Sequence, residues 1–375
     1  MHIKSFQEHF KPVEDPRQGA KVRHPLFDVL FGTLCAVISG AKGWHDIREY
    51  VLGHHDWFRD HGLFKLGVPV DDTFARIISS VEPEQFRESF LVWMKAVHEL
   101  TEGNVVAIDG KTLRGSYNRD ERSSAIHMVS AYASANKLVL GQLKTDSKSN
   151  EIIAIPELIK MLELRGALVT IDAMACQTKI AKAIVKQGGH YLLAVKGNQS
   201  NLAKAVQAAF SKQRGQSPDA QELQTETGRG RIESRISHVL RADALEGDFS
   251  NWCSLNTIAM VESYRTEKGK PTSLEYRYYI SSKEMTATQI ATAVREHWAI
   301  EAMHWVLDVS LQEDACQIFK KNAAENLACL RHMSLNMLRS EPTKASIPTK
   351  QKRCWMKTEN LEKVLVAGFS AMADS

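Results

Sequence analysis

The sequence predicts an α/β protein in which a mixed β-sheet follows a helical N-terminal region. Through about the first 95 residues, apolar side chains recur at the i, i+3 and i+4 spacing of amphipathic helices. The middle of the chain alternates short apolar runs of strand length with helical segments. Helical spacing returns after residue 285, beyond a strand-rich stretch. Strands that alternate with helices predict a sheet covered by helices, and a hairpin among the strands predicts mixed strand directions.

The composition bounds the class of protein. The 375 residues are 43% hydrophobic and 25% charged, which is typical of a soluble globular protein with more than one structural unit. The net charge of +4 permits an anionic partner without requiring one. Six scattered cysteines without a CxxC pair indicate free thiols in a reducing compartment, not a disulfide framework or a zinc site. The polar N-terminal residues lack the apolar core of a signal peptide. We therefore expect a cytoplasmic protein without a membrane partner.

Residues 1–98 are expected to form a helical domain. The stretches 26–41 and 83–100 both show helical apolar spacing. Pro83 stands in the first turn of the second stretch, where a helix tolerates proline. The apolar part of the first stretch is only about 15 residues long and contains Asp28, so it is interpreted as a buried helix and not as a membrane span.

Residues 99–200 show the pattern of an α/β layer. Three strand-like runs come first, and the turn-forming sequence SANK between the second and third predicts a hairpin. Two helical segments and two more strands then alternate, and the second helical segment ends in a glycine pair. In order, the runs are NVVAIDG, IHMVSAYASA, KLVLGQLKT, EIIAIPELIKMLEL, ALVTIDA, QTKIAKAIVKQGG and HYLLAVKGNQ.

The remaining chain divides into three parts. Residues 201–285 are interpreted as a β-rich insertion, because SRISHVLRA, NTIAMVESYRTE and SLEYRYYISS are strand-like. Residues 286–340 contain two further helical stretches that would complete the core. Residues 341–375 are expected to form a basic tail, since the stretch 342–357 has no acid and five basic residues: Lys344, Lys350, Lys352, Arg353 and Lys357.

Two of the predicted strands end in an aspartate, Asp109 in VVAID and Asp172 in LVTID. A carboxylate just beyond a buried strand lies at the carboxyl edge of the sheet, where α/β proteins bind ligands. If the two strands are neighbours, both carboxylates face one spot, and they repel unless a proton or a cation lies between them. A site with only oxygen ligands favours Mg²⁺ or Mn²⁺ over zinc. The alternative is that each aspartate only caps the turn that follows it.

A third acid lies in the stretch HWAIEAMHWVLDV. On a helix, His297, Glu301, His304 and Asp308 share one polar face. We expect the apolar residues, and the tryptophans Trp298 and Trp305, to pack this helix onto the sheet or the insertion. Acids from two strands and a helix would hold two divalent ions of the kind that catalyses phosphoryl transfer. The alternative is a solvent-exposed face with i, i+4 pairs.

Basic and amide side chains follow the same strands. Lys111 and Arg114 come just after Asp109, and "AVKGNQ" places another such group at the end of a further strand. These residues suit contacts to phosphates, and the amides suit contacts to bases or sugars. The alternative is ordinary loop polarity. The full set of expected DNA contacts is Lys111, Arg114, Lys196, Asn198, Gln199, His297 and His304, with Asp308 supporting the helix.

Several motifs resemble those of a known family, the ISAs1-type (H-repeat-associated) DDE transposases. They are AIDGKTLRGS, TDSKSNEIIAIPELI, TIDAMACQ, YLLAVKGNQ and HWAIEAMHWVLDVSLQEDAC, in the order in which the family has them. The N-terminal stretch DPRQGAKVRHPLFDVLFGTLCAVISGAKGWHDI also resembles the helical domain that precedes the catalytic domain there. The likeness extends from about Asp15 to Arg339.

The resemblance implies an RNase H-like core that a β-rich insertion interrupts before the last catalytic helix. It implies that Asp109, Asp172 and Glu301 are the DDE triad and bind two divalent ions, usually Mg²⁺ or else Mn²⁺. The implied reaction is hydrolytic nicking at the ends of an insertion sequence, followed by attack of the freed 3′-hydroxyl on target DNA. The expected partner is double-stranded DNA, bound by a homodimer or higher oligomer in the bacterial cytoplasm, at the nucleoid.

Two positions depart from related patterns. Ala302 follows the glutamate where the family often has asparagine, and His297 and Asp308 stand where the broader IS4 group has arginine and lysine. The N-terminal helices and the stretch 342–357 are the candidates for recognition of the element ends. Two other functions stay open: a metal-dependent nuclease that cuts without joining, and a catalytically inactive DNA-binding protein derived from a transposase.

Overall fold

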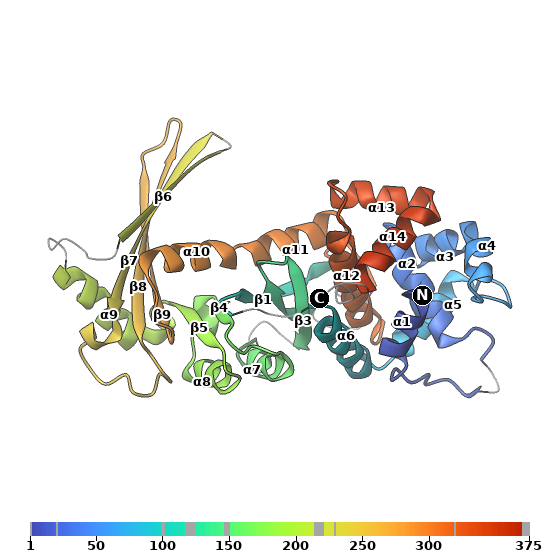
Figure 1. Ribbon diagram of the computed structural model, residues 1–375, viewed down its shortest axis with the longest axis horizontal. Coiled ribbons are helices and arrows are strands. Elements are labelled where there is room, and N and C mark those ends of the chain that lie inside the picture. The colour runs from blue at the N-terminus through green and yellow to red at the C-terminus, as the bar shows by residue number, and fades with distance from the viewer. Residues whose placement is uncertain are drawn as a thin grey trace.

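The computed structural model describes residues 2–19, 22–98, 102–116, 125–145, 151–213, 221–228, 230–318 and 320–369. One nine-stranded sheet with the order β3-β2-β1-β4-β5-β9-β8-β7-β6 runs through the protein. The molecule is elongated, with the N-terminal and C-terminal helices together at one end and the last four strands of the sheet at the other (Figure 1).

The first five strands form the core half of this sheet. They are β1 (Val105–Leu113), β2 (Ile126–Ala133), β3 (Leu138–Thr145), β4 (Leu168–Ile171) and β5 (His190–Val195). β2 is antiparallel to β1 and β3, whereas β4 lies parallel to both β1 and β5. The helices α7 (Glu151–Met161) and α8 (Thr178–Lys186) lie together beside this half (Figure 1). This order and these directions are those of an RNase H-like core, which confirms the expected fold.

In the described part of the N-terminal region, the helices that precede the sheet are α1 (His2–Phe10), α2 (Leu26–Ile38), α3 (Trp44–Gly53), α4 (His55–Asp60), α5 (Asp71–Ser80) and α6 (Pro83–Val97). α2 is almost entirely buried, as its apolar run predicts. The Asp28 carboxylate accepts a hydrogen bond of 2.7 Å from the backbone nitrogen of Phe64, which satisfies this buried acid. No helix in the described ranges is long and apolar enough to cross a membrane.

The insertion continues the same sheet. It contains α9 (Ser200–Gln213), β6 (Gln221–Gly228), β7 (Arg231–Arg241), β8 (Thr257–Glu267) and β9 (Ser273–Ser281). β9 is antiparallel to β5, so the insertion strands are bonded directly to the core. The sequence predicts β7, β8 and β9 but neither α9 nor β6. β6 has the polar sequence QELQTETG and pairs only with β7 at the sheet edge, so it needs no apolar alternation.

Among the residues described after the insertion, the helices are α10 (Ala287–His297), α11 (Ala299–Val309), α12 (Ala323–Ser340), α13 (Ile347–Met356) and α14 (Thr358–Phe369). The first of the two helical stretches expected in residues 286–340 is in fact two helices, because a tight turn at Trp298 separates α10 from α11. There the Trp298 backbone nitrogen bonds to the Arg295 oxygen, three residues back, at 3.2 Å.

Most of the segment expected as a basic tail is folded. α13 and α14 pack against each other and against α12. Lys350 is buried, and its Nζ donates to the Leu338 backbone oxygen at 2.8 Å and meets a Glu341 carboxylate oxygen at 3.0 Å. This lysine therefore caps the end of a helix and is not exposed to a phosphate backbone.

Candidate active site

The two aspartates lie side by side, but only Asp172 follows the end of its strand. The expectation that a strand also ends at Asp109 is wrong, because Gly110–Leu113 continue β1 by pairing with β2. β1 and β4 are parallel neighbours in which Ile108 pairs with Ile171, so Asp109 and Asp172 each follow the same register pair. Parallel pairing in register brings both acids to one point on the carboxyl edge of the sheet. The sequence predicts that the two carboxylates face one spot only if their strands are neighbours, and β1 and β4 are neighbours.

Helix α11 brings the third acid to this edge. Its buried side chains Ile300, Met303 and Leu307 pack against Ala107 of β1. Because alternate strand residues share a face, Ala107 and Asp109 both point toward α11. The exposed Glu301 then lines the same pocket as Asp109 and Asp172, a hollow of about 170 Å³. The packing of the apolar face of α11 against β1 thus determines the position of Glu301.

Burial and neighbouring carboxylates raise the pKa of Asp109 and of Glu301. Burial raises the pKa of Asp109 to about 6, and the charges of Glu151, Asp172 and Glu301 add to the effect. Burial also raises the pKa of Glu301; Arg277 opposes this rise and Asp172 adds to it. Mutual repulsion of this kind is relieved by a cation placed among the carboxylates.

The three carboxylates have the right chemistry to bind a divalent ion, but they do not lie close enough together to share one. The three side chains offer only carboxylate oxygens, the ligands that Mg²⁺ and Mn²⁺ prefer. Asp172 uses Oδ1 to accept a 2.7 Å bond from the Ala173 backbone nitrogen, which is the turn cap considered as an alternative, and a carboxylate has a second oxygen. Within the described ranges, no three His, Cys, Asp or Glu side chains are grouped closely enough to hold a metal ion. The carboxylates must therefore move together to share an ion.

The amides expected to contact DNA hold the loop after Asp172. Asn198 Nδ2 donates to the Ala173 backbone oxygen at 2.7 Å, and Gln199 Nε2 donates to the Cys176 backbone oxygen at 2.9 Å. Lys196, at the end of β5, is exposed and lines the pocket. Of the three residues expected to contact DNA here, Lys196 therefore lines the pocket, whereas the amides of Asn198 and Gln199 form hydrogen bonds within the protein.

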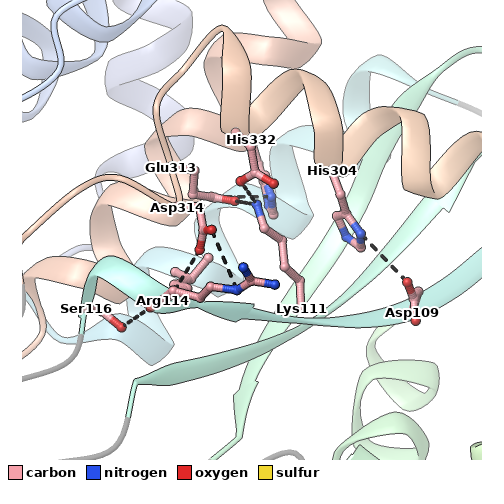
Figure 2. A network of polar contacts seen from close by, with 10 residues as sticks. Asp109, Lys111, Arg114, Ser116, His304, Glu313, Asp314 and His332 are labelled. Atoms are coloured by element: carbon pink, nitrogen blue, oxygen red, sulfur yellow. Dashed lines mark hydrogen bonds and ion pairs between the residues drawn. The ribbon is translucent and has the colours of Figure 1, made fainter.

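Both histidines of the polar helix face approach the strands. His297 lines the pocket, and its Nδ1 lies 2.9 Å from Thr170 Oγ1 on β4. Burial lowers the pKa of His304 to about 3, so this side chain is uncharged at neutral pH. Its Nδ1 is 3.7 Å from Asp109 Oδ2 (Figure 2), a distance too long for a hydrogen bond. The contact is thus neither an ion pair nor a hydrogen bond at neutral pH.

Lys111 and Arg114 lie in different surroundings. Lys111 Nζ contacts Asp308 Oδ1 and donates to Glu313 Oε2 at 2.8 Å. The Arg114 side chain is 84% exposed, and its Nε is 3.9 Å from Asp314 Oδ2 (Figure 2). Arg114 is thus free to meet a phosphate, while the ammonium group of Lys111 is enclosed by acids.

The insertion adds a cation that the sequence analysis does not identify. Arg277 of β9 lines the pocket, and its Cζ lies 4.9 Å from the ring centre of Trp298. The alternation within SLEYRYYIS places Arg277 on one face of its strand, but the sequence cannot show that β9 pairs with β5.

The expectation for the two tryptophans is wrong in part. Trp298 contacts Arg277 of the insertion, as expected, yet it is 42% exposed. Trp305 is 62% exposed and does not pack the helix onto the sheet. Ile300, Met303 and Leu307 do that packing instead. The helix therefore needs no aromatic side chain to hold it, and the indoles stand beside Glu301 on the surface.

Comparison with known proteins decides the family. Residues 100–337 match the family described as "Transposase DDE domain", and residues 7–94 match "DDE_Tnp_1-associated". The "H repeat-associated putative transposase YhhI" of Escherichia coli (strain K12) is 43% identical over 372 residues, covering 97% of this chain and 98% of that protein. The chain belongs to the DDE transposase family. The "H repeat-associated putative transposase YbfD" of the same organism is 46% identical over 242 residues, covering 64% of this chain and 95% of the relative.

These findings confirm the expected family resemblance over nearly the whole chain. The match to the DDE domain spans all three acids, the insertion and α11. The match to the associated domain spans most of α1–α6, so the helical region belongs to this transposase as well.

Proposed function

We propose that this DDE transposase cuts DNA at the ends of an insertion sequence and joins the freed 3′-hydroxyl ends to target DNA. Asp109, Asp172 and Glu301 are the proposed catalytic carboxylates. One observation carries the proposal: acids from β1, β4 and α11 line a single pocket, and two of them follow the same register pair. A carboxylate cluster at this edge suits phosphoryl transfer better than any other reaction that the neighbouring residues support.

The three carboxylates would hold the metal. Two bound Mg²⁺ or Mn²⁺ ions would activate the attacking oxygen and stabilise the leaving oxygen. The protein's part is to hold three carboxylates together in a half-buried pocket, although their negative charges repel one another when no cation lies between them. Packing of α11 on β1 holds Glu301 near Asp109, and the amides after β5 hold the loop that follows Asp172.

The cations around the pocket are proposed to bind the DNA backbone. Lys196 and Arg277 line the pocket together with the acids, and Arg114 is exposed in the turn directly after β1. Arginine and lysine at such positions bind phosphates and set the register of a DNA strand. Because the net charge is only +4, this local grouping and not the overall charge would attract DNA.

The remaining parts of the proposal concern partners and place. We propose that double-stranded DNA, at both the element ends and the target, is bound by a dimer or higher oligomer in the bacterial cytoplasm. The N-terminal helices are the proposed region for recognition of element ends, since they form a separate match within the family.

The test is a cleavage and joining assay with Mg²⁺. The substrate is duplex DNA taken from both flanks of the gene, mixed with a supercoiled target plasmid. We expect nicked ends and joined products, and Asp109→Asn, Asp172→Asn and Glu301→Gln should each lower both by about 1,000-fold or more. Cut ends without joined product would show a nuclease. A parent protein without any metal-dependent cleavage would show a DNA-binding relative of a transposase and overturn the catalytic proposal.

A further inference from the structure

One lysine joins the strand of Asp109 to the helix of Glu301. Lys111 lies two residues after Asp109 on the same face of β1, and Asp308 lies seven residues after Glu301 on the same face of α11. Lys111 Nζ contacts Asp308 Oδ1 and donates to Glu313 Oε2 at 2.8 Å. A single ammonium group therefore links points close to both of these catalytic acids.

Glu313 is placed in the protein interior, where a carboxylate needs a partner. Its side chain is 2% exposed. Burial alone would raise the pKa of Glu313, but the charges of Lys111, His332 and Arg331 bring it below its ordinary value. Figure 2 shows Lys111 reaching from its strand to this acid. An ionised carboxylate in such a place is costly without its cation, so the Lys111 pair is a fixed part of the fold.

Asp308 also needs Lys111 to explain its position. The carboxyl end of a helix carries a partial negative charge, so an acid in its last turn is unfavourable. The last turn of α11 has no basic residue. The cation that offsets Asp308 comes from β1, which means that the strand and the helix end stabilise each other.

A backbone contact extends this link beyond the strand. Gly115 N donates to the Asp314 backbone oxygen at 2.9 Å. Arg114 N donates to Asp314 Oδ1 at 2.7 Å (Figure 2). A Cβ atom at Gly115 would stand 2.6 Å from the Cys316 oxygen, so the two segments approach as closely as glycine allows. The turn after α11 is thus held along β1 from Lys111 to Gly115.

The enclosure makes Lys111 a poor phosphate ligand. Its side chain is 12% exposed, and its ammonium group faces two carboxylates. The two carboxylates offset the positive charge of Lys111, so its ammonium group offers little attraction to a phosphate. The lysine that directly follows the Asp-Gly pair therefore acts inside the protein.

We propose that Lys111, Asp308 and Glu313 form an ionic clamp that positions Asp109 against Glu301 and so sets the affinity of the pocket for divalent ions. These three are positioning residues and do not touch DNA or metal themselves. The inference rests on the proposed function, because it takes the pocket to be the metal site. Groups that orient ligands without binding the ion typically change metal affinity by about 10-fold to 100-fold.

The experiment measures Mn²⁺ binding by electron paramagnetic resonance on the purified full chain without DNA. Lys111→Met keeps the length of the side chain and removes its charge, and should weaken Mn²⁺ binding by about 10-fold or more. Asp308→Asn keeps the buried Lys111–Glu313 pair, so it folds more readily, and should weaken binding in the same direction by a smaller factor. Unchanged Mn²⁺ affinity in both variants would overturn the clamp.

A second readout separates the clamp from a phosphate contact. We expect metal-free DNA affinity of Lys111→Met, and its dependence on salt, to equal those of the parent. A phosphate contact would instead lower the affinity and reduce the salt slope by about one. Lys196→Met is the matched control, since this exposed lysine should show the opposite pattern: weaker DNA binding and a smaller salt slope, with Mn²⁺ affinity that is not weakened because a positive charge leaves the pocket lining.

The failure of the clamp and that of the proposed function give different results. If Asp109→Asn binds Mn²⁺ as tightly as the parent does, the pocket is not the metal site and the proposed function fails. If Asp109→Asn abolishes binding while neither Lys111→Met nor Asp308→Asn affects it, only the clamp fails. Cleavage supplies the last check: in Lys111→Met, higher Mn²⁺ concentrations should restore it.

Discussion

The two sides of the pocket are supported by different chemistry. On the β1 side, the buried charges of Lys111 and Glu313 tie the strand to the helix end. On the β4 side, the neutral amides of Asn198 and Gln199 hold the loop after Asp172 by single hydrogen bonds to backbone oxygens. A buried ion pair is expensive to break from one side, whereas a neutral hydrogen bond contributes little net stability. The comparison implies that Asp109 and Glu301 are fixed rigidly to each other and Asp172 more loosely.

The largest effect is expected when the charge on the β1 side is removed. Lys111→Met leaves Glu313 buried without its main cation and should lower the free energy of unfolding by about 3 kcal/mol. Chemical denaturation followed by circular dichroism measures this. Adding Glu313→Gln should recover at least half of the loss, because the unpaired charge is then gone. A double variant no more stable than Lys111→Met would show that the pair does not carry the β1 side.

A smaller effect is expected from the backbone contact on the same side. Gly115→Ala places a Cβ 2.6 Å from the Cys316 oxygen and 2.7 Å from the Asp314 oxygen. Because backbone atoms cannot turn away as side chains do, this overpacking should cost about 2 kcal/mol. Gly197→Ala is the control on the other side, since a Cβ there would meet no atom within 4 Å. Equal loss in both variants would contradict close contact between β1 and the turn after α11.

The amides of the β4 side should contribute less again. Asn198→Ala removes the 2.7 Å bond to the Ala173 oxygen and should lower the free energy of unfolding by about 1 kcal/mol. Amide hydrogen exchange at Ala173–Cys176, followed by mass spectrometry, should rise in this variant and stay unchanged in Lys111→Met. A stability loss as large as that of Lys111→Met would remove the difference between the two sides.

The smallest effect is expected at the exposed tryptophan. Trp305 is 62% exposed, so Trp305→Ala should change the free energy of unfolding by no more than about 0.5 kcal/mol. Leu307→Ala, two residues further on the buried face, should cost several times more. Thermal unfolding of the two variants measures the difference. A large loss of stability in Trp305→Ala would show that Trp305 does pack α11 against the rest of the protein.

The sequence predicts the acids of the pocket better than it predicts the contacts that hold them in place. VVAID and LVTID share a pattern, and the pairing of Ile108 with Ile171 confirms that their acids are neighbours. Helical spacing places Glu301 on a polar face, and Glu301 lines the pocket. Lys111 is different: its partner Glu313 lies 202 residues away, so sequence spacing cannot show that this cation is already paired. The sequence alone therefore favours a phosphate contact for this lysine.

The elements missed along the chain share a physical cause. β6 lies at the sheet edge with a polar sequence, and so lacks the alternation that marks a half-buried strand. α13 and α14 bury only a narrow stripe against the other helices, and the basic residues of α13 dominate its composition. Trp305 misleads in the opposite way, because a large apolar side chain on a helix is expected to be buried.

The pairing of β9 with β5 has a mechanical consequence. Because nine strands are joined in one ladder, tension on the outer hairpins of β6–β9 passes through backbone hydrogen bonds to β5 and then to β4. β4 ends at Asp172, the acid with the looser support. A displacement of the outer strands would therefore reach β4 and Asp172 before it reaches β1 and Asp109.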